Sequence, residues 1–455
     1  MSTPTAPVLP DPYLPENGSD GYRVEHYDLD LECKLGGNHL AGTATITATS
    51  ARALAKIEFD LAGLKVLKVS VNGKKAAFKM RGDRLVVSPA TRVPAGERFT
   101  AAIRYAGSPS PRAGVWGEVG WEELDDGVLV AGQPNGAATW FPCNDHPSQK
   151  ATYRIAVATD ADYRAVCNGE LVDHTRKASR ERWVYEVREP MATYLATLQI
   201  GRYERWVIPA DGAGIGGRHA AAVVLPAQIL LAPAELKAKA EAAFADQPRM
   251  IATFSEAFGP YPFDAYAAVV TEDELEIPLE AHGLSIFGRN HLAPGWEQQR
   301  LIAHELSHQW FGNSLTAARL QDIWMHEGFA CYAEWLWSEA AGQGTVDERA
   351  RAAYAGLAKK PQDVRVGEPG AANMFDDRVY KRGALTVHAV RRWLGDTAFF
   401  AMLRAWTQAN RHGHVDYPRF IAHVDQAAGH ADGAEELMRP WLFATALPPF
   451  PVSRA

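Results

Sequence analysis

The chain has 455 residues, which is too long for one ordinary hydrophobic core and predicts two or three domains. Its 47% hydrophobic, 10% aromatic and 22% charged residues are typical of a globular protein and exclude a disordered chain. The net charge of −7 comes without a long basic run, so the sequence offers no surface typical of a nucleic-acid or anionic-membrane partner.

From the sequence we expect neither a signal peptide nor a membrane span. The first twenty residues are rich in proline and contain no apolar stretch that could serve as a signal peptide. No run of eighteen apolar residues follows, which argues against a membrane span. The four cysteines are scattered without a C-x-x-C pair, so we expect buried reduced thiols and a cytoplasmic location.

The first two hundred residues have the period of β-strands. Apolar and polar side chains alternate over residues 26–35, 57–61 and 99–105, which is typical of half-buried strands. Residues 67–71 lead into Asn72-Gly73, a dipeptide suited to a tight hairpin turn. We predict a large antiparallel sheet assembly that forms an N-terminal domain over residues 1–205.

Helical patterns dominate after residue 205. The stretches 232–258, interrupted by Pro248, 296–311 and 322–342 are rich in helix formers, whereas 265–271 is a short apolar run that predicts a strand. Alanine-rich helical patterns continue toward the C-terminus. We place the domain boundary in the glycine-containing stretch 205–218, so that residues 206–455 form the second domain.

The segment HELSHQWFGN, residues 304–313, contains two histidines that are four positions apart. On a helix, His304 and His308 project from one face and can both reach one metal ion. Glu305 follows the first histidine and can approach a water on that metal without being a ligand. An isolated H-E-x-x-H pattern also arises by chance on an ordinary helix surface, so the reading depends on a third ligand.

Glu327 is the candidate third ligand. It lies nineteen positions after His308 on the next predicted helix, and Gly312 and Asn313 offer a turn between the two helices. Two histidines, one glutamate and an open position form the ligand set of a catalytic zinc hydrolase. Not every histidine nearby needs to bind, and His326 is not expected to be a ligand. The combined spacing favours the metal site.

These residues resemble the zinc signature of the aminopeptidase N family of gluzincin metallopeptidases. The resemblance extends over nearly the whole chain and rests on several further segments: GQPNGAATWFPCNDHPSQKATY, FGPYPFDAY, WMHEGFA, VYKRGAL and WLFATALPPFP. It implies a multidomain α+β fold, in which an antiparallel β-saddle domain precedes a thermolysin-like, mainly helical catalytic domain. It also implies removal of N-terminal residues from peptides.

The resemblance assigns roles to individual residues. It implies that His304, His308 and Glu327 bind one Zn²⁺ ion per chain and that Glu305 is the general base. Tyr380 in VYKRGAL matches the family tyrosine that stabilises the tetrahedral oxyanion. The chemistry is consistent with these roles, since a carboxylate can move protons and a phenol can donate to developing negative charge. Without the resemblance, Tyr380 would be read as a packing residue.

The loop that binds the substrate amino group departs from the family pattern. Family members carry G-x-M-E-N, whereas this chain reads EIPLEAHGL, residues 276–284. Glu280 aligns with the essential glutamate, Ile277 replaces the glycine and Ala281 replaces the asparagine. Gln133 matches a family glutamine that assists there. A carboxylate beside an ammonium group is what exopeptidase selection requires, and Glu276 is a rival for that role.

Two further expectations concern the surroundings of the site. Glu334 lies two helical turns after Glu327, and we expect it to accept a hydrogen bond from a ligand histidine, although a solvated helix carboxylate fits the pattern too. About 150 residues follow His304, so the chain resembles a short form without the additional C-terminal helical domain, and we expect an open cavity.

The sequence therefore predicts a zinc aminopeptidase that acts on peptides with free N-termini. The state of assembly is expected to be a monomer or a small homo-oligomer. An alternative within the same fold is a zinc endopeptidase, if the altered loop no longer holds the amino group. An inactive peptide-binding scaffold is a second alternative, but such a protein would be expected to have lost ligands or base.

Overall fold

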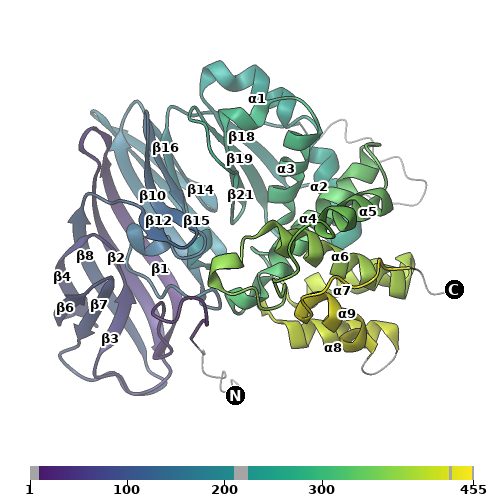
Figure 1. Ribbon diagram of the computed structural model, residues 1–455. Coiled ribbons are helices and arrows are strands. Elements are labelled where there is room, and N and C mark those ends of the chain that lie inside the picture. Colours follow the sequence, from purple (N-terminus) through teal and green to yellow (C-terminus); the bar gives the residue numbers. More distant parts are fainter. Residues whose placement is uncertain (1–9, 210–223, 430–432, 453–455) are drawn as a thin grey trace. The chain divides into compact units, whose positions relative to one another are not determined.

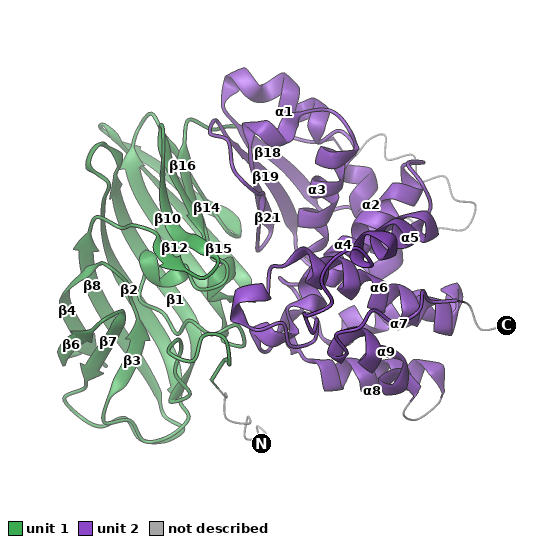
Figure 2. Cartoon of the chain, in the orientation of Figure 1, with its two compact units in different colours: residues 1–204 green, residues 205–455 purple. Residues whose placement is uncertain are grey.

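The computed structural model describes residues 10–209, 224–429 and 433–452. The chain divides into two compact units, Met1–Glu204 and Arg205–Ala455, coloured separately in Figure 2. The first unit is rich in strands and the second is mainly helical, so the predicted α+β class is confirmed. Only the first residues of the linker predicted at 205–218 are described, because the remainder lies outside these ranges. The same holds for residues 1–9 of the proline-rich start.

The largest element of the first unit is an eight-stranded sheet with the order β14-β15-β12-β1-β2-β8-β4-β5 (Figure 1). Its strands are β1 (Tyr22–Lys34), β2 (His39–Ser50), β4 (Lys65–Val71), β5 (Lys74–Lys75), β8 (Arg98–Gly107), β12 (Lys150–Asp160), β14 (Glu170–Lys177) and β15 (Arg180–Ala192). One pairing in the predicted antiparallel assembly runs the other way. Strands β1 and β12 are parallel, and the chain between Lys34 and Lys150 passes through strands of all three sheets of this unit before it returns in the same direction.

Two smaller sheets complete the first unit. One contains β9 (Arg112–Gly114), β10 (Gly117–Leu124), β11 (Gly127–Ala131), β13 (Arg164–Cys167) and β16 (Leu198–Gly201). The other contains β3 (Ile57–Asp60), β6 (Ala77–Arg81) and β7 (Arg84–Ser88). Buried side chains from strands of all three sheets form one hydrophobic core. Burial of this apolar surface is the main force that holds the unit together.

The hairpin that follows β4 forms as predicted, but one of its side chains faces the other way. Asn72 and Gly73 have φ values of 50° and 74°, as a tight turn of this kind requires. The strand contains a bulge between Val66 and Lys68, where its register against β8 shifts. The bulge leaves Leu67 47% exposed, whereas strict alternation would have placed it beside the buried Val69.

The second unit contains a five-stranded sheet with the order β17-β18-β19-β21-β20. Its strands are β17 (Glu204–Val207), β18 (Ala227–Ala232), β19 (Ala265–Thr271), β20 (Leu279–Ala281) and β21 (Leu284–Gly288). The strand predicted at 265–271 is β19, which runs parallel to both of its neighbours. Strand β20 is antiparallel to its neighbour β21, because the two strands are joined by a short turn. A separate pair is formed by β22 (Thr316–Ala317) and β23 (His414–Val415).

The described helices of the second unit follow the predicted helical stretches with shorter bounds. They are α1 (Lys237–Ala243), α2 (Gln247–Phe258), α3 (Trp296–Ser307), α4 (Trp324–Ala340), α5 (Val346–Leu357), α6 (Asp377–Leu394), α7 (Asp396–Ala409), α8 (Tyr417–Ala428) and α9 (Gly433–Phe443). Pro248 does not interrupt a helix but is the second residue of α2, where its missing N–H costs no hydrogen bond. The break predicted there lies before α2 instead.

Two predictions about side chains and membranes can be compared with the described residues. All four cysteines are free and buried, as expected. Among the helices of the described ranges, none combines the length and the apolar character that crossing a bilayer demands.

Candidate active site

The two histidines lie where α3 ends. His304 belongs to the last turn of the helix, and His308 is the first residue after it, with φ −57° and ψ −21°. The His308 N–H still donates to the His304 carbonyl at 3.3 Å, so both side chains keep the i, i+4 geometry. The helix predicted over 296–311 therefore stops four residues early. The chain then turns at Gly312, whose φ of +123° is open to glycine.

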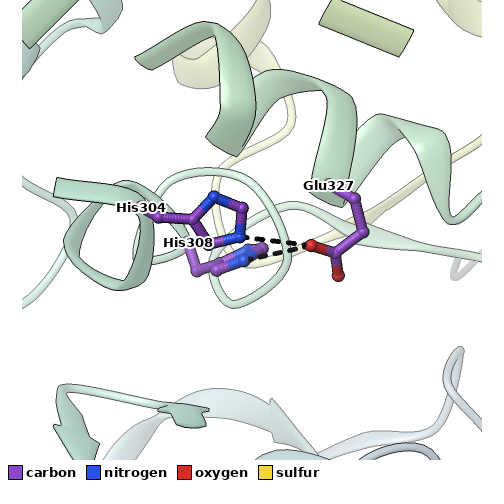
Figure 3. A group of neighbouring side chains, drawn as sticks. All are labelled: His304, His308 and Glu327. Atoms are coloured by element: carbon purple, nitrogen blue, oxygen red, sulfur yellow. Dashed lines mark ion pairs between the residues drawn. The ribbon is translucent and has the colours of Figure 1, made fainter. Parts of the chain in front are cut away.

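Glu327 completes a compact group with the two histidines. It lies in the first turn of α4, and its Oε2 atom is 3.4 Å from His304 Nε2 and 3.5 Å from His308 Nε2. The three potential ligand atoms lie within 4.8 Å of one another, and all three residues are buried. Figure 3 shows the imidazoles and the carboxylate converging from different elements. This donor set fits a tetrahedral zinc ion with one position left for water or substrate.

Each imidazole is oriented through its second nitrogen. His304 Nδ1 lies 2.8 Å from Glu334 Oε1, and His308 Nδ1 lies 2.9 Å from the Phe311 carbonyl oxygen. Both Nδ1 atoms thus donate away from the cluster and leave Nε2 as the metal-facing atom. The sequence pointed to Glu334 but not to Phe311, because a carbonyl can be recognised only once the turn at Gly312 is known.

Glu334 is held in its charged form. Burial alone would raise its pKa, but the Lys381 ammonium, the hydrogen bond to His304 and the Arg300 guanidinium lower that pKa to about 2. Arg300 Nη1 is 3.4 Å and Lys381 Nζ is 3.9 Å from the same Glu334 oxygen. An ionised acceptor strengthens the hydrogen bond from His304 and fixes the ring.

The carboxylates around the histidines create a site that favours a cation. Burial lowers the pKa of His308, but the charges of Glu327 and Glu280 outweigh burial and raise that pKa to about 10. Burial likewise opposes a charged His304, yet its hydrogen bonds to Glu327 and Glu334 raise its pKa to about 9. Negative potential of this kind at two Nε2 atoms is what a divalent ion requires.

Glu305 lies among these charged groups, and one of its carboxylate oxygens makes no hydrogen bond to the described residues. Its side chain is buried, and in the described part of the chain its Oε2 atom has no hydrogen-bond partner. Burial is the largest cause that raises the pKa of Glu305, and the nearby Glu327 and Glu334 raise it further. A carboxylate of raised pKa with a free oxygen is suited to accept and return a proton.

Tyr380 approaches the same cluster from α6. Its ring lies nearly parallel to that of His304, with centroids 5.9 Å apart and an interplanar angle of 18°. Burial raises the pKa of Tyr380 well above its usual value, and the charges of Glu327, Glu280 and Glu305 add to the effect. The phenol therefore stays protonated and remains a hydrogen-bond donor.

Glu280, rather than Glu276, lies beside the cluster. It is the central residue of β20, and a carboxylate oxygen of Glu280 lies within 4.8 Å of ligating atoms of Glu305 and His308. Burial, together with the charges of Glu327 and Glu305, raises the pKa of Glu280 to about 7 against the opposing effect of His308. Glu276 is exposed in the loop before β20.

Two side chains from the turn after α3 bind the backbone next to Glu280. Neither of them was singled out as a site residue from the sequence. Gln309 Nε2 and Asn313 Nδ2 donate to the Ala281 carbonyl at 3.1 and 2.9 Å. Gln309 Oε1 accepts from the Gly283 N–H at 2.9 Å. Because these bonds use the backbone, replacement of the family asparagine by Ala281 does not remove them. Both residues lie within HELSHQWFGN, but nothing in that segment indicates which backbone groups they bind.

Two further residues named in the sequence analysis have contacts or backbone features of their own. His326 Nε2 accepts a hydrogen bond from the Ala317 N–H at 2.7 Å, which is a structural contact between α4 and β22. Gln133 belongs to the first unit, after β11, and its bond to Pro134 is cis. Its part in substrate binding stays a prediction.

Family models match both units of the chain. The model described as Peptidase family M1 domain matches residues 242–441, and the Peptidase M1 N-terminal domain matches residues 23–195. The first match contains the whole zinc cluster, Glu280 and Tyr380. The chain belongs to the M1 family of zinc metallopeptidases, and the predicted resemblance to the aminopeptidase N family is confirmed.

Curated relatives include aminopeptidases from distant organisms. The chain is 23% identical over 444 residues to probable aminopeptidase 1 of Saccharolobus solfataricus and covers 53% of that protein. It is 24% identical over 327 residues to leukotriene A-4 hydrolase of Xenopus laevis and covers 51% of it. The chain thus spans about half the length of curated relatives such as these.

Solved structures of the M1 zinc metallopeptidase from Deinococcus radiodurans have nearly the same extent as this chain. One is 30% identical with a TM-score of 0.86 and covers 98% of this chain and 99% of its own. A mutant of that enzyme bound to a Tyr-Ser-Ala substrate is 29% identical with a TM-score of 0.87 and covers 97% of this chain and 98% of its own.

Proposed function

We propose that this protein is a zinc aminopeptidase that hydrolyses N-terminal residues from peptides. The observation that carries the proposal is the convergence of His304, His308 and Glu327, with Glu280 and Glu305 beside them; the Oε2 atom of Glu305 has no hydrogen-bond partner among the described residues. The substrate of the Deinococcus relative supports it, because Tyr-Ser-Ala is a short peptide. We further propose that residues 1–205 and 206–455 are the two functional domains.

One zinc ion per chain would be held by His304 Nε2, His308 Nε2 and a Glu327 oxygen. When bound, zinc lowers the pKa of water and polarises a carbonyl group. The hydrogen bonds from the two Nδ1 atoms to Glu334 and Phe311 keep the rings oriented for this task. Glu334 therefore acts through His304 and does not touch the substrate.

In peptide hydrolysis, Glu305 would transfer protons and Tyr380 would stabilise the developing negative charge. Glu305 accepts a proton from the attacking water and later delivers it to the leaving amine, which a single carboxylate of raised pKa can do in both directions. Tyr380 donates its phenolic hydrogen to the oxygen on which negative charge develops. Its burial keeps the donor in place as a neutral phenol.

Glu280 would make the enzyme an exopeptidase. A carboxylate close to the free α-ammonium group of a peptide forms a charge-assisted hydrogen bond that an acylated N-terminus cannot form. The anchoring of Ala281 and Gly283 by Gln309 and Asn313 holds Glu280 in position. Gln133 would assist at the same ammonium group.

We also propose a compartment, a substrate class and a state of assembly for the enzyme. Four free, buried cysteines support a reducing, cytoplasmic compartment. The acidic net charge of −7 supports peptide substrates rather than nucleic acid. A monomer or small homo-oligomer is the assembly that we propose.

The test combines metal content with two reporter peptides. Purified protein is analysed for zinc by elemental analysis and is assayed on an aminoacyl reporter and on its N-acetylated form. We expect close to one zinc per chain, turnover of the free reporter and no turnover of the acetylated one. Cleavage of acetylated peptides at internal bonds would instead establish the endopeptidase, and absence of zinc and turnover would establish the scaffold.

A further inference from the structure

Helices α4 and α6 touch each other through two glycines. A methyl group added at Gly328 would lie 2.8 Å from both the Cα and the carbonyl carbon of Gly383. A methyl group added at Gly383 would lie 2.9 Å from the Gly328 Cα. Neither glycine has a positive φ, so space and not backbone conformation is what requires glycine here. The two helix backbones are in direct contact.

This contact lies next to two residues of the candidate active site. Gly328 directly follows Glu327, and Gly383 comes three residues, or about one helical turn, after Tyr380. The Tyr380 ring on α6 lies nearly parallel to the His304 ring, with centroids 5.9 Å apart, so the phenol lies beside the candidate zinc ligands. The separation of the two helices therefore sets the position of the phenol relative to the zinc ligand.

We propose that Gly328 and Gly383 are positioning residues whose contact fixes the place of the Tyr380 donor relative to Glu327 and the neighbouring zinc ligands; this rests on the proposed peptidase function. Carbon atoms pack at about 3.5–4.0 Å, so a methyl group at either glycine must push the helices apart by roughly 1 Å. A donor to developing charge works at about 2.7–3.1 Å. A displacement of that size near the reacting atoms can lower the rate about 10²-fold.

Other contacts hold α6 in the second unit independently of the glycines. The Arg382 guanidinium donates to five backbone carbonyls at the C-terminal end of the described chain: those of Pro440, Trp441, Ala444, Thr445 and Ala446. Lys381 Nζ lies 3.3 Å from Cys331 Sγ on α4. Because these contacts remain in an alanine variant, we expect α6 to shift locally and the unit to stay folded.

The experiment is a double-mutant cycle with Gly383→Ala, Tyr380→Phe and the combined variant. Gly356→Ala is the matched control, because Gly356 lies in α5 with nothing within 4 Å of an added methyl group. We expect Tyr380→Phe to lower kcat roughly 10²–10³-fold and Gly383→Ala roughly 10–10²-fold. Both should keep zinc content and KM near wild type, and the control should be unaffected. The combined variant should be no slower than Tyr380→Phe alone.

Two readouts besides turnover accompany the cycle. A phosphinic peptide analogue of the tetrahedral state should bind Gly383→Ala at least tenfold more weakly than wild type, and a crystal structure should show α6 displaced from α4.

The positioning role would be overturned if the losses in kcat multiply in the combined variant. It would also be overturned if Gly383→Ala keeps full activity with α6 in its wild-type position. If Gly383→Ala does not fold, Gly328→Ala places the methyl group from the other side. Failure of both to fold makes the contact a folding requirement and rejects the proposal. An inactive wild type would reject the proposed function first.

Discussion

A buried carboxylate in the first unit and one in the second unit differ in their ion-pair and hydrogen-bond partners. In the first unit, Asp60 forms an ion pair with Arg84 at 2.5 Å and accepts hydrogen bonds from the Gly18 and Asp145 N–H groups. In the second unit, Glu305 lies beside the zinc cluster with one buried oxygen that is unpaired among the described residues. Removal of one partner from a buried ion pair destabilises a fold, whereas an unpaired carboxylate oxygen beside candidate metal ligands is suited to proton transfer.

The partners of a buried carboxylate indicate whether it serves the fold or the site. Asp60 has both carboxylate oxygens engaged, so nothing remains for a ligand. The carboxylates of the second unit face two imidazoles that are themselves oriented from behind. We therefore expect substitutions in the second unit to change metal binding and turnover, and substitutions at Asp60 to change stability alone.

The largest effect is expected for His308→Ala. Removal of one of three ligands should abolish tight zinc binding and reduce turnover to background, because the remaining donors cannot complete a tetrahedral site. Zinc is measured after dialysis against a weak chelator. His326→Gln is the control, since His326 contacts the Ala317 N–H and should keep its zinc. Stoichiometric tight zinc in His308→Ala would mean that the metal site has been misplaced.

Glu305→Gln should separate chemistry from metal binding. The amide cannot accept the proton of the attacking water, so kcat should fall roughly 10²–10⁴-fold. Zinc content and thermal stability should stay near wild type, because Glu305 is not a ligand. Steady-state kinetics and elemental analysis on the same sample check both statements. Near-normal turnover would remove Glu305 from the mechanism.

Glu280→Ala should lower activity less than the two preceding variants, and the loss should be confined to substrates with a free N-terminus. A charge-assisted hydrogen bond to the α-ammonium group contributes about 1.5–3 kcal/mol to binding. Its loss should lower kcat/KM on a free aminoacyl reporter roughly ten- to a hundredfold. Glu276→Ala is the control and should change kcat/KM little, because Glu276 is exposed. If Glu276→Ala is the crippling change, the anchor of the amino group must be reassigned.

Asp60→Asn in the first unit should affect stability without affecting the chemistry. The substitution leaves Arg84 without its buried partner, and we expect the free energy of unfolding to fall by about 3 kcal/mol. Urea unfolding measures this change, and kcat per folded molecule should stay within about twofold. Asp28→Asn breaks the half-exposed pair with Arg154 and should cost less than about 1 kcal/mol. Equal effects of the two variants would contradict the comparison.

The smallest effect concerns a buried side chain that stays neutral. Burial, assisted by the charge of Arg392, lowers the pKa of His388 to about 4. The folded state thus binds a proton less readily than the unfolded state. The stability that His388 contributes is complete above about pH 6.5 and is lost as the pH falls toward 4, by about 2 kcal/mol at pH 5. His388→Gln should lose correspondingly less stability between pH 7 and pH 5 in urea unfolding, with the exposed His414→Gln as control. An unchanged pH dependence would contradict the shifted pKa.

Local signals in the sequence determined the strands, most of the helices and the spacing of the zinc-binding candidates. The Asn72-Gly73 turn and the strand at 265–271 are properties of a few adjacent residues, and the structure contains both. The i, i+4 spacing of His304 and His308 is set by the helix period, so it survives even though α3 ends before His308. The spacing on the next predicted helix extended this reading to Glu327, and the match of the family segments extended it to Tyr380.

Contacts between residues far apart in the chain were decided only by the tertiary structure. The parallel pairing of β1 with β12, the two hydrogen bonds to the Ala281 carbonyl and the contact of Gly328 with Gly383 each join segments that no local pattern connects. A carbonyl such as that of Phe311 has no sequence signature at all, since every residue carries one. Periodicity and turn chemistry act over a few residues, whereas packing and hydrogen-bond partners depend on which surfaces meet after the chain has folded.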